Sequence, residues 1–198
     1  VEEHREVRER YERLYSHWHE LERGESALQR LSKKLDEAME RRFYATLEEV
    51  RNEFVDVFQL LFEGGTADLV LTGEGTIWDR GIDVIAQPPG KKLQRLSLLF
   101  GGEKALTAIS LLFAFIRCNP APFVILDAID TALDQTNLDR FARFLDEAAD
   151  TNQFVLVTHQ KRTMEEADVL YGVTMTGDGT SRIVSVKLSA AEELVAQG

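Results

Sequence analysis

The 198-residue sequence has a single cysteine and no long apolar run, and each scarcity excludes a class of protein. Cys118 cannot form a disulfide within the chain, so we interpret it as a small core residue of a protein in a reducing compartment. Residues 105–116 are interrupted by Thr107 and end at Arg117, short of the roughly 18 apolar residues that span a bilayer. The first residues are acidic and helical in character, unlike a secretory signal. We expect a cytosolic protein.

Positive charge is also scarce. The sequence has 23 Lys and Arg against 34 Asp and Glu, a net charge of −11, which argues against a protein whose whole surface binds nucleic acid. A local basic patch is the exception: Lys91, Lys92, Arg95 and Lys104 cluster around a glycine pair. They are equally well explained as solvated charges beside a loop. Contact of DNA with Lys91, Lys92 and Arg95 is therefore a secondary hypothesis.

A third absence concerns phosphate binding. The sequence contains no G-x-x-x-x-G-K-[ST] loop, and Gly90-Lys91-Lys92 has Ile85 where the upstream glycine would stand. Two other features of a nucleotide site are present. The pair Gly101-Gly102 opens a predicted helix, whose N-terminal amides favour phosphate, and an apolar strand ends at Asp127, where a carboxylate can meet Mg²⁺. The sequence therefore predicts half of an ATP site.

Residues 1–62 contain no proline and are predicted to be helical. Apolar residues recur at alternating spacings of four and three, which is typical of a coiled-coil seam. Such a helix needs a partner, either a second copy in a parallel homodimer or a helix from elsewhere in a longer polypeptide. From residue 41 to 62 the pattern broadens into an aromatic packing face, where we expect the helix to enter a globular domain, and Gly64-Gly65 ends it. The seam comprises Val7, Tyr11, Leu14, Trp18 and Leu21, continued by Leu28, Leu35 and Met39.

The remainder alternates strands and helices, which predicts an α/β fold with a mostly parallel sheet covered by helices on both faces. We expect strands at 68–72, 82–87, 123–126 and 153–158, and helices at 102–117, 136–149 and 163–167. An antiparallel pair, 169–175 with 182–188, is predicted across Gly177-Asp178-Gly179. In such sheets ligands bind at the carboxyl ends of the strands, where Asp127 and His159 fall. Ala132-Leu133-Asp134 follows Asp127 as a turn.

The order of these motifs resembles the C-terminal half of the ATPase head of a bacterial SMC (structural maintenance of chromosomes) protein. The resemblance rests on residues 85–94, on 101–109, on 122–127, on Thr158-His159 and on 163–175. It implies a coiled-coil stub over 1–42, the C-terminal lobe of an ABC-type ATPase over 43–189 and a tail over 190–198. It also implies that the phosphate loop lies in an N-terminal half of the same head.

The resemblance implies roles for individual residues. Gly101, Gly102 and Glu103 match the signature motif, which contacts the γ-phosphate of ATP bound to a second head. Asp127 matches the Walker B acid, which acts on Mg²⁺ through water. Asp134 matches the D-loop, and His159 matches the switch histidine, so these two are the candidate catalytic residues.

Two positions depart from the family pattern. Phe100 stands where the family has a serine that donates to phosphate, and Ala128 stands where it has a glutamate that acts on the attacking water. We therefore expect the isolated chain to be inactive as an ATPase.

The resemblance also implies partners: a second SMC head, a kleisin subunit with its associated protein, and DNA through the full complex, in a nucleoid-associated cytoplasmic protein. Three alternatives stay open. The chain could be chiefly a kleisin-binding module, with residues 169–175 and 182–188 as the docking edge. It could instead belong to a zinc-hook DNA-repair ATPase, or to a transporter nucleotide-binding domain, which the long heptad helix disfavours.

Overall fold

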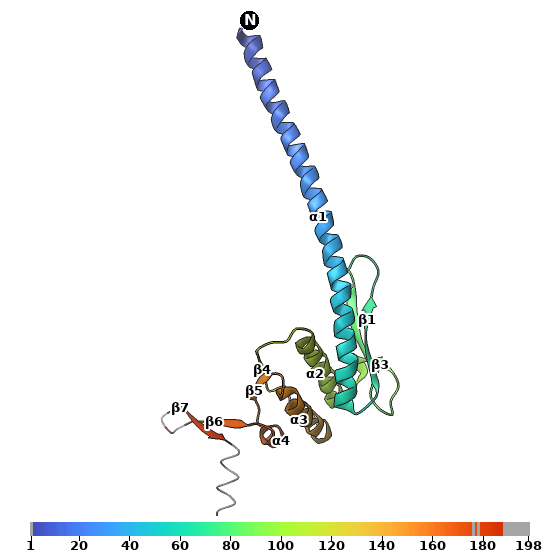
Figure 1. The fold of residues 1–198 in the computed structure, drawn as a ribbon, viewed down its shortest axis with the longest axis vertical. Helices are drawn as coiled ribbons and strands as arrows, with labels where there is room; N and C mark the ends of the chain where they lie inside the picture. The colour runs from blue at the N-terminus through green and yellow to red at the C-terminus, as the bar shows by residue number, and fades with distance from the viewer. Residues whose placement is uncertain (1, 176, 178, 188–198) are drawn as a thin grey trace, which may run out of the picture. The chain divides into compact units, whose positions relative to one another are not determined.

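The computed structural model describes residues 2–175, 177 and 179–187, and the chain divides into two compact units, residues 1–48 and 49–198. One helix, α1 (Glu2–Phe62), runs through both units (Figure 1). The helix predicted for residues 1–62 is therefore confirmed over the described residues. Among those residues, no helix is long and apolar enough to cross a membrane.

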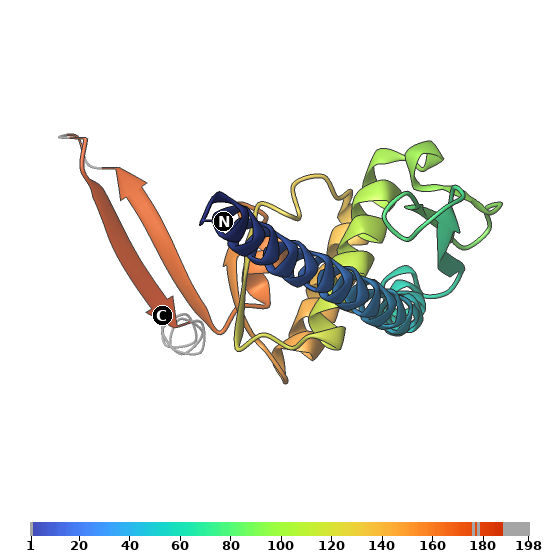
Figure 2. The same ribbon diagram turned by 90° about the horizontal axis from the view of Figure 1, so that it is seen from above.

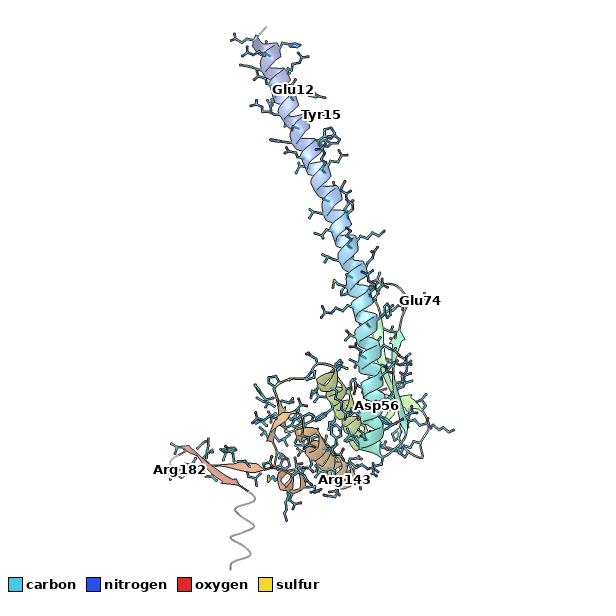
Figure 3. All side chains as sticks on the ribbon, viewed as in Figure 1. Glu12, Tyr15, Asp56, Glu74, Arg143 and Arg182 are labelled. Atoms are coloured by element: carbon cyan, nitrogen blue, oxygen red, sulfur yellow. The ribbon has the colours of Figure 1, made fainter. Side chains whose placement is uncertain are left out.

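The first unit consists of α1 up to residue 48. Every residue of the predicted seam is exposed, from 46% for Met39 to 73% for Leu21. Aromatic rings on this helix contact one another along one side: Tyr11 stacks on Tyr15 at 5.9 Å, and Tyr15 meets His19 edge-on at 4.5 Å. Tyr15 and Glu12 are labelled on this part of the helix in Figure 3. A helix with an exposed apolar seam fits the coiled-coil prediction, and the identity of its partner stays a prediction.

In the second unit, the C-terminal turns of α1 supply much of the core. The predicted aromatic face is buried because its residues recur three and four positions apart and so share one side of the helix. Phe58 stacks on Phe62 at 4.1 Å and meets Phe54 edge-on at 6.1 Å. The helix ends with Gly64-Gly65; a Cβ on Gly65, whose φ is +80°, would clash with the Gln87 carbonyl oxygen. The buried residues of this face are Val50, Phe54, Val57, Phe58, Leu61 and Phe62.

An antiparallel sheet follows, formed by β1 (Thr66–Thr72), β2 (Gly81–Gln87) and β3 (Gln94–Arg95). Its register pairs Thr66 with Gln87 and Thr72 with Gly81, so both predicted strands are confirmed. Arg51 of α1 donates hydrogen bonds to both carboxylate oxygens of Asp68 on β1. The guanidinium of Arg51 is the main reason that the pKa of Asp68 is lowered. This ion pair fastens the sheet to the end of α1.

A short 3-10 turn, η1 (Leu96–Leu98), leads into α2 (Gly101–Cys118), which is followed by β4 (Phe123–Asp127), α3 (Gln135–Ala149) and β5 (Gln153–Val157). β4 and β5 pair in parallel, with Phe123 opposite Gln153 and Asp127 opposite Val157. Phe113 of α2 packs against both α3 and β5. Its ring lies 4.8 Å from that of Phe144 on α3 and 5.7 Å from that of Phe154 on β5. The βαβ order predicted for this segment is confirmed.

The prediction of a mostly parallel sheet covered on both faces is wrong for this chain. The described strands form three separate sheets, in which β4–β5 is the one parallel pair. Successive side chains of a strand point to opposite faces, and only one face of this pair meets the helices. The other face lies open to solvent: Phe123 is 54% exposed and Ile125 is 62% exposed, and Val155 and Val157 are exposed beside them.

The described chain closes with α4 (Lys161–Glu165) and an antiparallel pair, β6 (Val169–Met175) with β7 (Ser181–Lys187). Figure 2 shows these two strands running side by side as a ribbon. The predicted pair is confirmed, with Met175 opposite Ser181, and the predicted 163–167 helix lies two residues earlier. Leu188 and the predicted 190–198 tail lie outside the described residues.

Candidate functional site

The start of α2 carries the predicted phosphate-binding glycines. Phe100 occupies the N-cap with extended backbone (φ −66°, ψ 158°), and its ring is 74% exposed. An N-cap serine could accept a hydrogen bond from a first-turn amide, and Phe100 makes no such side-chain bond. Nothing lies within 4 Å of the position that a Cβ on Gly101 would take. The helix start therefore presents open backbone at Gly101, beside an aromatic ring in place of a hydroxyl.

Lys91 contacts two residues at this helix start. Its Nζ lies 2.8 Å from Oε1 of Glu103 and 4.2 Å from the centroid of the Phe100 ring. Arg95, a second member of the predicted basic patch, lies 3.3 Å from Oδ2 of Asp83. Both cations thus have an acidic partner within the chain, which weakens the patch as a surface for nucleic acid. Glu103, predicted to belong to the nucleotide site, holds Lys91.

Gly102 packs directly against Asp134, the predicted D-loop residue. A Cβ on Gly102 would lie 2.6 Å from Asp134 Oδ2, so a larger residue here would have to displace that carboxylate. Asp134 caps α3: its Oδ1 accepts the Asn137 N–H at 3.0 Å, and its Oδ2 accepts the Asn137 side-chain amide at 3.0 Å. The structure thus brings together Gly102, predicted to belong to the signature motif, and Asp134, predicted to belong to the D-loop. It gives Asp134 a capping role, and its catalytic role stays a prediction.

Asp127 and His159 lie at the same edge of the β4–β5 pair. Asp127 ends β4 opposite Val157, the last residue of β5, and His159 follows two residues later. Both side chains are exposed. Within the part of the chain that the structure describes, no hydrogen bond or ion pair engages either of them, and no three potential metal ligands cluster. One free carboxylate suits a cation whose other ligands come from elsewhere, which is compatible with the predicted Mg²⁺ contact.

Ala128 adopts a left-handed backbone conformation directly after the acid. Its φ is +50°, and its N–H donates to the Val157 carbonyl at 2.9 Å. This region disfavours residues with a Cβ, and strained residues of this kind cluster at functional sites. The exposed methyl group supplies no acid or base at this position.

Asp130 also belongs to this edge, although the sequence did not predict it as a site residue. The residue is 1% exposed, and its Oδ2 accepts the hydroxyls of Thr158 and Thr163, each at 2.6 Å. Its Oδ1 is buried and has no hydrogen-bond partner among the described residues. An acid three positions after Asp127 is a weak signal, since only the fold shows that it faces two threonines. Asp130 joins the loop after β4 to the loop after β5.

The predicted site residues therefore lie on segments that contact one another. Gly102 touches the loop between Asp127 and Asp134, and Asp130 of the same loop holds the segment that carries His159. These contacts join the helix start to the loop that follows β4, and the ends of β4 and β5 lie side by side. The arrangement offers backbone amides, one carboxylate and one imidazole, and it includes no general base at position 128.

Comparison with known proteins agrees with an SMC-type head. Residues 13–182 match the family described as the RecF/RecN/SMC N terminal domain, and the chain belongs to this family. It is 46% identical over 195 residues to the chromosome partition protein Smc of Bacillus subtilis, covering 98% of this chain and 16% of that protein. The chain thus spans about one sixth of the length of this curated relative.

Two solved structures support the same α/β head fold. One is the Smc head domain from Pyrococcus furiosus, which has an extended coiled coil and is bound to the C-terminal domain of ScpA. It is 33% identical to this chain with a TM-score of 0.76, and the match covers 96% of this chain and 48% of that one. A chain described in connection with ATP-driven dimerization and DNA-stimulated activation of SMC ATPases is 36% identical with a TM-score of 0.70, covering 80% and 96%.

Proposed function

We propose that this chain forms the C-terminal lobe of an SMC head and supplies half of an ATP site that a second head completes. The observation that carries this proposal is the contact of Gly102 with Asp134, which joins the glycine-led helix start to the loop after Asp127. The absence of a phosphate loop from the sequence supports a site that needs the N-terminal half of the head. The exposed apolar face of β4–β5 supports the same view, because such a face needs cover.

Each residue of the edge has a distinct task in this proposal. The amides of Gly101 and Gly102 bind the γ-phosphate of ATP held by the opposite head, aided by the positive end of the α2 dipole. Asp127 would hold Mg²⁺ through water, and such an ion would supply neutralisation of the phosphate charge. His159 donates a hydrogen bond toward the γ-phosphate. The turn that ends at Asp134 orients water or backbone near the phosphate, while the Asp134 side chain caps α3.

Hydrolysis is the step that this chain is least equipped to perform. A carboxylate at position 128 would orient the attacking water, and the methyl group of Ala128 cannot. Phe100 stands where the family resemblance puts a phosphate-binding serine, and Lys91 lies against its ring. We therefore expect nucleotide binding in an assembled head, with turnover lowered by about 10²–10⁴-fold, the usual contribution of a general base. The chain by itself is expected to be inactive.

The test is to assemble the chain with the phosphate-loop half of an SMC head and to titrate ATP. Binding should weaken in Asp127→Asn, while Asp146→Asn, which changes an exposed acid on α3, should leave it unchanged. Turnover should appear when Ala128→Glu is combined with Phe100→Ser. A measurable ATPase rate in the isolated chain, abolished by Asp127→Ala, would overturn the proposal.

A second function, docking of a kleisin, is favoured by the β6–β7 pair. One face of this pair is apolar and uncovered: Tyr171, Val173, Met175 and Ile183 are 68–77% exposed. The P. furiosus head was solved with the C-terminal domain of ScpA bound, so a related domain is a suitable ligand. Calorimetry with such a domain should show binding that Val173→Lys abolishes and Thr174→Lys, on the opposite face, does not. Equal loss in both variants would argue against this face.

The same proposal assigns the remaining partners and the location. The helix over residues 2–48 pairs with a helix from the N-terminal half of the same protein, and a second head closes over the ATP site. DNA is contacted through the complete complex, together with the kleisin and its associated protein. Such an assembly works in the cytoplasm, on the nucleoid. The chromosome partition protein from B. subtilis supports this placement.

A further inference from the structure

The Asp130 carboxylate is the most deeply buried acidic group at the site edge. It is 1% exposed, and both of its hydrogen bonds come from hydroxyls, those of Thr158 and Thr163. Burying a carboxylate is costly, so packing alone is a poor reason for an acid at this position. The two threonines lie 28 and 33 residues further along the chain, on either side of the start of α4.

The contact with Thr158 acts on the backbone around His159. The Thr158 hydroxyl donates a hydrogen bond to Asp130. This bond leaves the hydroxyl oxygen free to accept the N–H of Gln160, at 2.9 Å. This second bond spans His159, the residue between them. The turn carrying the imidazole is thus held at both of its ends by one hydroxyl, and the hydroxyl is held by Asp130.

We propose that Asp130 is a positioning residue, which acts through Thr158 to hold the 158–160 turn and so sets the orientation of His159 at the edge where β4 ends. The effect on nucleotide turnover rests on the function proposed above, whereas the effect on the turn does not. Thr163 accounts for the other bond and fastens α4. The pair provides a matched comparison, because both hydroxyls donate to the same oxygen at the same distance.

The first experiment follows the Gln160 amide by hydrogen exchange in the assembled head, without nucleotide. Thr158→Val removes the hydroxyl and keeps the side-chain shape, so exchange at Gln160 should rise about five- to tenfold, the equivalent of one hydrogen bond. Thr158→Ser restores the hydroxyl and should return the rate to within about twofold of the original. Thr163→Val should leave it unchanged. Unaltered exchange in Thr158→Val, or equal acceleration in Thr163→Val, would overturn the positioning of the turn.

The second experiment measures ATP turnover in a head carrying Ala128→Glu and Phe100→Ser. Thr158→Val and Asp130→Ala should each lower kcat about tenfold and leave KM within about twofold, while Thr163→Val should lower thermal stability and keep kcat. In a His159→Ala background, Thr158→Val should cost nothing further, because its effect passes through that side chain. Additive losses would overturn the proposal. A head that binds no ATP would instead refute the proposed function, and the exchange experiment would still decide the role of Thr158.

Discussion

Gly102→Ala should destabilise this chain, against the ordinary effect of replacing a helical glycine. Alanine normally favours a helix over glycine by about 0.8–1 kcal/mol. Here the new methyl carbon would lie 2.6 Å from Asp134 Oδ2 and 3.2 Å from Nδ2 of Asn137. The Asp134 carboxylate must move, which breaks the bond from the Asn137 N–H that caps α3 and the bond from the Asn137 side chain. Losing an N-cap costs about 0.5–2 kcal/mol and losing one further hydrogen bond about 0.5–1.5 kcal/mol, so the combined cost exceeds the helix gain.

The net expectation is a loss of about 1 kcal/mol in the free energy of unfolding, measured by urea denaturation. Gly101→Ala is the matched control, because nothing lies within 4 Å of its new methyl group, and it should be neutral or stabilising. In an Asp134→Ala background the obstruction is gone, so Gly102→Ala should become stabilising. The two substitutions should therefore couple by about 2 kcal/mol. If Gly102→Ala and Gly101→Ala stabilise the chain equally, the proposed approach of Asp134 to α2 is refuted.

Three further outcomes are expected. Ala128→Gly should raise stability by about 0.5–1 kcal/mol in urea denaturation, because glycine tolerates a φ of +50°; a loss would contradict the left-handed backbone. The pKa of Asp68 is lowered, chiefly by its bond from Arg51, so its stabilising contribution should be lost as pH falls through that lowered pKa, and Asp68→Asn should flatten the acid limb of stability against pH. Burial, then the charge of Glu53, raises the pKa of the Cys118 thiol, so iodoacetamide should label it more slowly than a free thiol at about pH 8, and Glu53→Gln should speed labelling.

Local patterns predicted the elements of this fold well. Over the described residues, the helix predicted for 1–62, the two strands before Pro88 and the βαβ segment appear within about two residues of where the 3.6- and 2-residue periods place them. Of the candidate site residues, Asp127 and His159 were placed correctly at strand ends, because a strand's carboxyl end can be read from where its apolar run stops. Their chemical roles stay predictions.

The arrangement of strands into sheets could not be predicted from the sequence. A run of apolar residues in β4 and β5 indicates burial on both faces, whereas Ile125 and Val155 are exposed in this chain. A continuous apolar run predicts that both faces of a strand are buried. It does not identify the segment that packs against each face. For the same reason, the apolar run does not predict that the described strands form three separate sheets.

The sequence by itself determined the order and type of the main helices and strands, with ends within about two residues, and which acid and imidazole fall at strand ends. Only the tertiary structure decided that Gly102 lies against Asp134, that Lys91 is held by Glu103, and that Asp130 is buried beneath the His159 turn. The physical reason is the range of the interactions. Backbone periods and turn preferences act over a few neighbouring residues, while Asp130 and Thr158 are 28 residues apart and meet only because β4 and β5 pair in parallel.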